Sequence, residues 1–356
     1  MRWRDLGFAL PFSLALLPGA SAALTASGLP VDLAAWFPLL VIFGVVPILD
    51  ALLGSDTTNP TISDGMQEER SPWYRGLVAM ALPVWFATLA YCLYQSHALH
   101  PGFAGILGWT LSTGVLGGIL AITPAHELIH KKASIERAIG GVLLTSVGYF
   151  GFKIEHVRGH HVHVATPHDA STALLGESAY SFVASALSSN TRNAWLLEAQ
   201  RMRQLGHSPW SPRNEMLGWT LLWLVFLSGA FYWQGLAGAA FFLAQGLIAA
   251  ATLEIINYME HYGLMRARDQ SGRYVRVSHL HSWNASQRLS NWLLFNLQRH
   301  SDHHAHARRR YQALLHHDDS PQLPAGYATM FVLALLPPLW RRVMDPRARG
   351  AREAAG

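Results

Sequence analysis

Six apolar segments, each close to the length of a membrane-spanning helix, constrain this 356-residue chain more than any other feature. A helix needs about 20 mostly apolar residues to cross the hydrocarbon core of a bilayer. The segments cover residues 7–29, 33–53, 77–95, 103–125, 216–233 and 235–256. Only 14% of the residues are charged, against roughly 25% in an ordinary soluble domain. We therefore predict an all-α membrane protein with six transmembrane helices rather than two soluble domains.

The basic residues beside these segments predict the orientation of the chain. Lys and Arg are enriched in cytoplasmic loops. Here they precede the first segment, lie in the 54–76 loop and follow residue 125, and they include Arg2, Arg70 and Lys131. We expect both termini in the cytoplasm and a hairpin at Gln234 and Gly235 between the last two spans. The net charge of +5 is attributed to such membrane-flanking residues and not to nucleic-acid binding.

The apolar segments and the histidine-rich stretches between and after them divide the chain into five predicted regions. Residues 1–125 hold the first four spans, 126–215 a cytoplasmic or interfacial histidine-rich region, and 216–257 the last two spans. Residues 258–346 form a second cytoplasmic histidine-rich region, and 347–356 a mobile tail. The short, glycine-rich stretch 138–154 is expected to be a partly buried helix that does not cross. Residues 326–340 are expected to lie along the interface.

Histidines are concentrated in one part of the chain, since 17 of the 19 lie between His126 and His317. Three clusters contain a pair spaced i, i+4, which places both imidazoles on one helical face where they can share a metal ion. A fourth cluster adds a single histidine after the last span. The nine clustered residues are His126, His130, His156, His160, His161, His261, His300, His303 and His304.

Nine imidazoles exceed what one metal ion holds, because zinc takes four ligands. They suit two ions, with four and five rings and a position open at each. Imidazole binds Zn, Cu, Fe and Ni, so the ligand type alone leaves the metal open. Cys92 is the only cysteine, which excludes an intrinsic iron–sulfur or Cys-ligated zinc site. The other ten histidines, His279 and His281 among them, are not assigned to this set.

Polar side chains next to these histidines are candidates for orienting them. A metal-bound imidazole usually donates its second N–H to a carboxylate or a carbonyl. The candidates are Glu127, Glu155, Glu254, Asn257, Glu260 and Asp302.

These motifs resemble the integral-membrane alkane 1-monooxygenases, a family within the membrane desaturase and hydroxylase superfamily. The strongest matches are HELIHKK at 126–132, EHVRGHHVHVATP at 155–167, NYMEHYGLMR at 257–266 and LQRHSDHHA at 297–305. HSWN at 281–284 and RRYQ at 309–312 add to them. The NYMEHYG segment favours the alkane-type hydroxylases over the acyl desaturases. One departure is His168, where many relatives carry an acidic residue; we expect it to face solvent.

The resemblance implies a six-span fold with a cytoplasmic di-iron site whose ligands are the nine clustered histidines. It implies insertion of one oxygen atom of O2 into the terminal C–H bond of an n-alkane, with release of water. It further implies electrons from a rubredoxin, itself reduced by an NAD(P)H-dependent reductase, and a location in the bacterial inner membrane. Because the chain has a single cysteine, the rubredoxin must be a separate chain.

An alkane dissolves in the bilayer, so we expect a substrate channel between spans. Ile42 stands where relatives often place a bulky aromatic residue that blocks longer substrates. This predicts a longer channel here, with Trp36 or Phe43 as possible compensating residues. The electron donor is expected to dock on Arg308, Arg309 and Arg310, because rubredoxins tend to be acidic.

Three alternatives remain open. A xylene- or terpene-type methyl hydroxylase would differ only in its cavity. An intramembrane zinc protease would use the HExxH pattern at 126–130, with Glu127 as general base, and would leave seven clustered histidines unused. A metal transporter would place its sites near the bilayer midplane, whereas these clusters lie at the predicted ends of spans.

Overall fold

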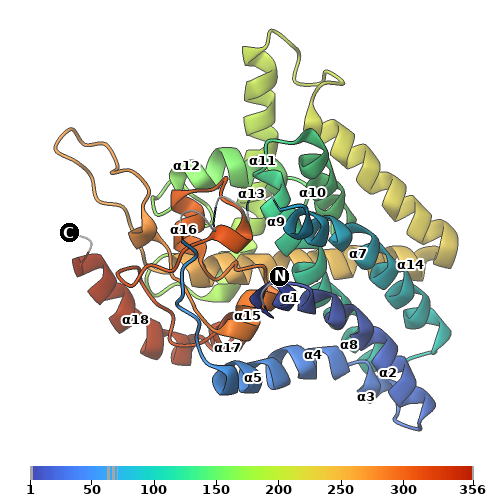
Figure 1. The fold of residues 1–356 in the computed structure, drawn as a ribbon. Helices are drawn as coiled ribbons and strands as arrows, with labels where there is room; N and C mark the ends of the chain where they lie inside the picture. Colours follow the sequence, from blue (N-terminus) through green and yellow to red (C-terminus); the bar gives the residue numbers. More distant parts are fainter. Residues whose placement is uncertain (1–2, 62–64, 66–68, 70, 355–356) are drawn as a thin grey trace.

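The computed structural model describes residues 3–61, 65, 69 and 71–354, and within them helices form all the regular structure apart from isolated bridges. This confirms the predicted all-α class (Figure 1). Arg2 and Arg70, which entered the prediction of orientation, lie outside the described residues.

Five helices of the described residues are long and apolar enough to cross a membrane. The first, Asp5–Ala26, includes α1 (Trp3–Gly7) in part, η1 (Leu10–Leu16) and α2 (Leu17–Ala26). The second, Val31–Leu53, joins α3 (Val31–Ala34), α4 (Phe37–Leu40), η2 (Val41–Val45) and α5 (Val46–Leu53). The third is α7 (Pro72–Ala98). The fourth, Phe103–Ile129, joins α8 (Phe103–Gly117), η3 (Gly118–Ile122) and α9 (Thr123–Ile129).

The fifth apolar helix, α14 (Glu215–His261), contains a break at the position of the predicted hairpin. Gln234 and Gly235 have non-helical backbone angles, and the φ of +62° at Gly235 is one that glycine adopts without strain. Figure 1 shows the two limbs of α14 meeting at an angle. The side chain of Asn214 caps the first limb by accepting from the backbone N–H of Met216 at 2.8 Å.

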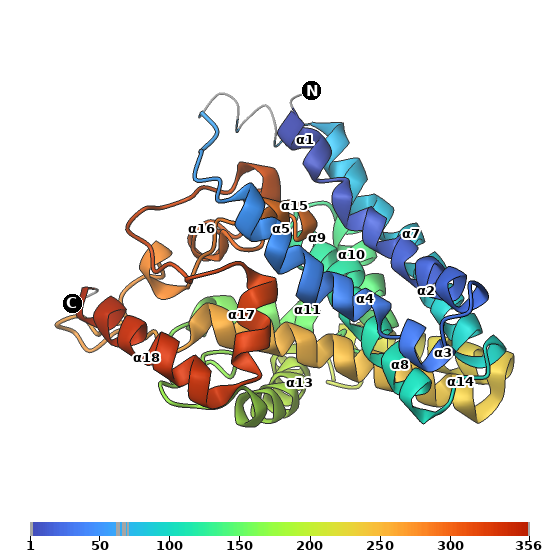
Figure 2. The same ribbon diagram turned by 90° about the horizontal axis from the view of Figure 1, so that it is seen from below.

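Small residues let α8 pack closely against the second limb of α14. A Cβ at Gly114 would lie 2.4 Å from Cβ of Ile248, and one at Gly117 would lie 3.2 Å from Cβ of Ala249. Such contacts are typical of helices that associate in membranes. Figure 2 shows α8 crossing this limb, with α2 and α7 running along the same end of the molecule. This apolar bundle supports the helix ends that carry the histidines.

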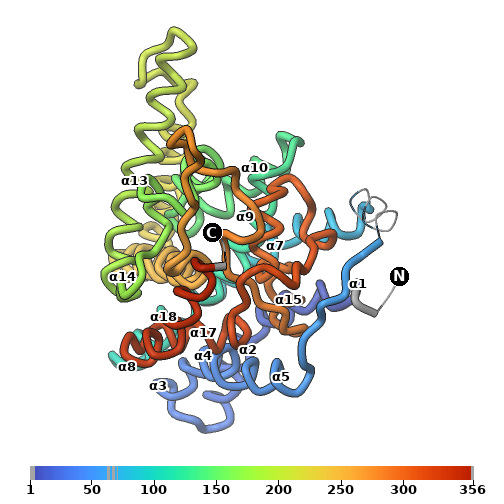
Figure 3. Tube along the Cα trace, turned by 90° about the vertical axis from the view of Figure 1, so that its left-hand side faces the viewer, coloured from blue at the N-terminus to red at the C-terminus, as the bar shows by residue number. Residues whose placement is uncertain are grey.

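The helices between α9 and α14 form a layer that carries the histidines of the second cluster, His156, His160 and His161. It consists of α10 (Ser134–Ser146), α11 (Phe152–Glu155), η4 (His156–His160), α12 (His161–His163) and α13 (Ala179–Gln204). With 13 residues, α10 is too short to span a membrane, as predicted for the 138–154 stretch. In the tube view, α13 and the first limb of α14 extend together away from the body of the molecule (Figure 3).

Short helices complete the C-terminal part of the chain. They are η5 (His279–His281), α15 (Arg288–Leu293), α16 (His300–Ala305), η6 (Tyr311–Ala313), α17 (Tyr327–Ala334) and α18 (Pro337–Ala354). The mobile tail expected from residue 347 is wrong for residues 347–354, which continue α18. Trp340, Met344 and Ala348, spaced i, i+4, i+8, form a fully buried stripe that holds this helix on the protein.

Candidate metal centre

The nine clustered histidines come together in two adjoining groups. The five-ring group contains His126, His130, His156, His161 and His303, and the four-ring group contains His160, His261, His300 and His304. Within each group one ring nitrogen per residue lies within 4.8 Å of all the others. The rings of His161 and His304 stack at 4.4 Å across the boundary, so the groups are neighbours. All four clusters therefore meet in one place.

The ring nitrogens point toward one another in both groups. In the five-ring group, Nε2 of His156 lies 2.8 Å from Nε2 of His126 and 3.1 Å from that of His161. In the four-ring group, Nε2 of His300 lies 3.2 Å from that of His261 and 2.9 Å from that of His304. Donors bound at right angles to one ion at about 2.1 Å would be ~3 Å apart. The spacing thus fits two metal sites.

A π-helical turn decides which histidines share a group. We expected His156 and His160 to share a face, as an i, i+4 pair does in an α-helix. In η4 the backbone N–H of His161 instead bonds to the carbonyl of His156, five residues back. This wider turn places His156 and His161 in the five-ring group and sends His160 to the four-ring group. Such π turns often mark functional sites, and a second one, η3, precedes His126.

Burial keeps most of these rings neutral, as metal ligation requires. Desolvation is the largest cause that lowers the pKa of His130, His156, His161, His300, His303 and His304. Nε2 of His130 is buried and has no hydrogen-bond partner among the described residues. The lone pair of this ring nitrogen is therefore available to bind a metal ion.

Carboxylates contact the four-ring group. The Asp169 carboxylate lies 2.9 Å from Nδ1 of His160, and Glu260 Oε2 lies 3.2 Å from Nε2 of His300. Burial opposes the charged form of His160, but the neighbouring Asp169 carboxylate raises its pKa. Our sequence analysis missed Asp169. It is the only acidic residue in the segment 162–176 after the EHVRGHH cluster, and that position was the available signal.

The other residues predicted to orient ligands have different partners. Glu127 forms a buried ion pair with Lys131 at 2.8 Å instead of contacting a ring nitrogen. Glu254 accepts hydrogen bonds from Tyr149, Asn190 and Asn257.

Two more of these predicted residues lie beside the rings without a hydrogen bond to them. Burial raises the pKa of Glu155 to about 8. Asp302 binds Arg309 at 2.6 Å and lies 3.0 Å from a ring nitrogen of His317, a residue left out of the predicted set.

The HSWN segment, residues 281–284, contacts both His261 and the helix that carries His300, His303 and His304. The Ser282 hydroxyl lies 3.4 Å from Nδ1 of His261, and the Asn284 side chain accepts from the backbone N–H of Ser301 at 2.9 Å. His281 is buried, with Nδ1 accepting from the backbone of Ser278 at 3.0 Å. It therefore holds a turn and does not face either group.

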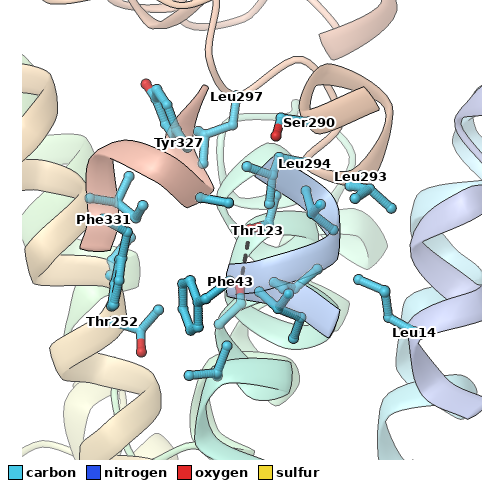
Figure 4. A pocket seen from close by; sticks show the side chains of 18 residues that line it. Leu14, Phe43, Thr123, Thr252, Ser290, Leu293, Leu294, Leu297, Tyr327 and Phe331 are labelled. Atoms are coloured by element: carbon cyan, nitrogen blue, oxygen red, sulfur yellow. Dashed lines mark hydrogen bonds between the residues drawn. The ribbon is translucent and has the colours of Figure 1, made fainter. Parts of the chain in front are cut away.

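An apolar cavity lies beside the histidines, between the second span, α14 and α17 (Figure 4). It holds about 700 Å³ of empty space, counting its open mouth. Ile42 and Phe43 line it as predicted channel residues, and Phe43 stacks on Phe331 at 4.9 Å. Trp36 does not line it. Its indole donates to the carbonyl of Ala104 at 3.1 Å, so of the three predicted channel residues Trp36 is the one that this cavity does not include.

A smaller inner pocket adjoins the apolar cavity and reaches the five-ring group. Thr123, Leu294 and Leu297 line both spaces. The inner pocket is also lined by His126 and His303. The apolar cavity is thus separated from two rings of the five-ring group only by residues that line both spaces.

Of the three arginines predicted to receive an electron donor, two have intramolecular partners. Arg309 pairs with Asp302 at 2.6 Å, and Arg310 pairs with Glu136 at 2.8 Å. Arg308 is exposed. His168 is also exposed, in line with the expectation that it faces solvent.

The amino-acid sequence of this chain is similar to those of known proteins. The family model for fatty acid desaturases matches residues 101–334. Alkane 1-monooxygenase 2 of Pseudomonas aeruginosa is 49% identical over 316 residues, which are 88% of this chain and 84% of the relative. Alkane 1-monooxygenase 2 of Alcanivorax borkumensis is 49% identical over 326 residues, 90% of this chain and 85% of the relative. The chain belongs to the alkane 1-monooxygenase family.

Membership of the alkane 1-monooxygenase family confirms the resemblance drawn from the motifs, and it makes this chain a multi-pass membrane enzyme, a monooxygenase. The xylene/toluene monooxygenase hydroxylase component of Pseudomonas putida is 30% identical over 307 residues, 86% of this chain and 79% of the relative. The alkane-type relatives are therefore considerably more similar. The zinc-protease alternative is dropped, since His126 and His130 belong to a group of five rings and Glu127 is paired with Lys131.

Proposed function

We propose that this chain hydroxylates the terminal carbon of n-alkanes to 1-alkanols, using O2 and a non-haem di-iron centre held by the nine histidines. The observation that carries the proposal is the apolar cavity together with the adjoining inner pocket, which shares lining residues with it and reaches His126 and His303. An alkane offers no polar atom for recognition, so a site for it must be apolar and must exclude water.

The reaction consumes an alkane, O2, two electrons and two protons, and yields a 1-alkanol and water. Two iron ions held by the five-ring and four-ring groups would supply the oxidising chemistry, which no side chain offers. The contribution of the protein is to position the substrate. A chain held end-on in the inner pocket presents its terminal carbon by proximity, although its internal C–H bonds are weaker.

The four hydroxyl groups that line the apolar cavity are all satisfied by the protein. Thr123 donates to the carbonyl of Gly118 at 3.0 Å, and Thr252 donates to the carbonyl of Ile248 at 2.8 Å. Ser290 donates to Asp50 at 2.5 Å, and Tyr327 donates to Glu260 at 2.8 Å. An alkane can therefore enter without leaving a polar group unpaired, which would otherwise cost about 1–3 kcal/mol each.

We place the enzyme in the bacterial inner membrane, with each limb of α14 crossing it and both termini in the cytoplasm. His126 and His261 lie at the ends of two apolar helices, which supports a site at the membrane boundary. We assign electron delivery to a separate rubredoxin with an NAD(P)H-dependent reductase, since one cysteine cannot hold an iron–sulfur centre.

The test is turnover of n-alkanes of graded length under isotopically labelled O2, with the enzyme in membranes and rubredoxin and its reductase added. We expect 1-alkanols that carry one labelled oxygen atom, and two iron ions per chain. Secondary alcohols as the main products, unlabelled alcohol, or a single zinc ion per chain would contradict the proposal.

A further inference from the structure

A third cluster of metal-binding side chains lies outside the two histidine groups. It contains His279, His317 and Asp319, and one ligand atom from each lies within 4.8 Å of the other two. His279 belongs to η5, whereas His317 and Asp319 belong to the loop before α17. The Asp319 side chain is 71% exposed and that of His279 is 30% exposed, so this cluster opens to solvent.

The side chains of the cluster already face one another. Nε2 of His279 lies 2.9 Å from Oδ2 of Asp319. The imidazoles of His279 and His317 are nearly parallel, 4.6 Å apart with 10° between their planes. Two imidazoles and one carboxylate thus lie together, although they come from two segments distant in the sequence.

A buried carboxylate fixes the tautomer of His317. Nε2 of His317 lies 3.0 Å from Oδ1 of Asp302. Arg309 and the backbone N–H of Leu315 also donate to Asp302, so this carboxylate acts as an acceptor. The imidazole must therefore carry its proton on Nε2, which leaves the lone pair of Nδ1 available. A ring held by a carboxylate in this way is the usual arrangement of a metal-bound histidine.

The loops that carry the cluster are held in place. The Ser320 hydroxyl donates to the carbonyl of His317 at 2.7 Å, and the Asn284 side chain in turn contacts Ser320. The Ser278 hydroxyl caps the turn of η5 that bears His279. Little ordering is thus needed before an ion can bind.

We propose that His279, His317 and Asp319 form a third, peripheral site for a divalent transition-metal ion. The donor set of two imidazoles and one carboxylate suits Zn²⁺ and related ions, and not Mg²⁺ or Ca²⁺, which prefer oxygen ligands. Solvent water completes the coordination, because the cluster is open on the side of Asp319. This site is independent of the proposed alkane reaction.

The test is equilibrium dialysis of the purified, iron-loaded enzyme against graded free Zn²⁺, with the protein purified through a tag that lacks histidine. Zinc and iron per chain are both measured by mass spectrometry. We expect the wild-type chain to take up one zinc ion with no loss of iron. His279→Ala should weaken this uptake at least tenfold, and Asp319→Asn should weaken it less.

His97→Ala is the matched control, because His97 is an exposed histidine at the end of α7. It should bind zinc as the wild type does. Equal zinc affinity in wild type and His279→Ala, uptake of zinc only in exchange for iron, or no uptake by the wild type would each overturn the proposal.

Discussion

The two histidine groups differ in what surrounds their rings. The five-ring group borders apolar side chains: Phe152 stacks on His156 at 4.4 Å, and the inner pocket brings Leu294 and Phe295 beside His126 and His303. The four-ring group borders carboxyl groups, with Asp169 beside His160 and Glu260 beside His300. One half of the centre therefore faces the cavity, and the other is supported by carboxylates.

This difference suggests a division of roles within the proposed centre. A carboxylate that accepts the second N–H of a ligating imidazole orients the ring and makes it a stronger donor. In the four-ring group, Asp169 gives this support to His160 through Nδ1, while Nε2 of the same ring points toward His304. The five-ring group has five rings from three helical segments and borders the route by which an apolar substrate would arrive. Substitutions near the five-ring group and near the four-ring group should therefore have different effects on the enzyme.

The largest effect is expected when the carboxylate support is removed from the four-ring group. Asp169→Asn keeps an acceptor beside His160 but removes the negative charge. We expect about a 10–100-fold loss of metal affinity at the four-ring group, with the five-ring ion retained. Iron per chain, measured during dialysis against graded chelator, should fall from two to one before it falls further.

Asp32→Asn is the control for this substitution. Asp32 accepts from the backbone N–H groups of Gly102 and Gly105 at the start of α8, away from both groups. It should leave the release of iron unchanged. Loss of both ions in step from Asp169→Asn would show that the two groups do not differ as argued.

The fold and the membership of the histidine set follow from patterns that the sequence displays directly. Apolar runs of about 20 residues identify membrane helices because the bilayer fixes their length. The spacing of His126 and His130 identifies a shared face because both lie on a regular helix. Periodicity of this kind requires no knowledge of tertiary contacts.

What could not be predicted depends on irregular backbone and on long-range contacts. The π turn at His156–His160 changes the partner of His156, and no i, i+4 rule anticipates it. Trp36 falls outside the cavity because its indole bonds to Ala104, 68 residues away. The pairing of Arg310 with Glu136 is likewise set by tertiary structure.

A smaller effect is expected at the cavity that serves the five-ring group. Ile42 is buried and lines the cavity, so Ile42→Trp should shorten the space available to an alkane. We expect turnover of the longest accepted alkanes to fall about tenfold or more, with shorter ones less affected and iron per chain unchanged. Product analysis across chain lengths provides the measurement. Trp36→Phe, outside the cavity, is the control, and an unaltered chain-length profile in Ile42→Trp would remove the channel assignment.

The smallest effect is expected at the surface beyond α16, the helix that supplies rings to both groups. Arg309 and Arg310 are engaged within the protein, so Arg308 is the arginine of this run whose charge faces solvent. Arg308→Glu should lower kcat/KM for rubredoxin about threefold at low salt, because surface charges act mainly on association and are screened by ions. The difference from wild type should shrink as ionic strength rises, whereas Arg203→Glu, at the exposed end of α13, should behave as wild type. Rubredoxin-dependent turnover that changes neither with ionic strength nor with Arg308→Glu would show that the donor docks elsewhere on the protein.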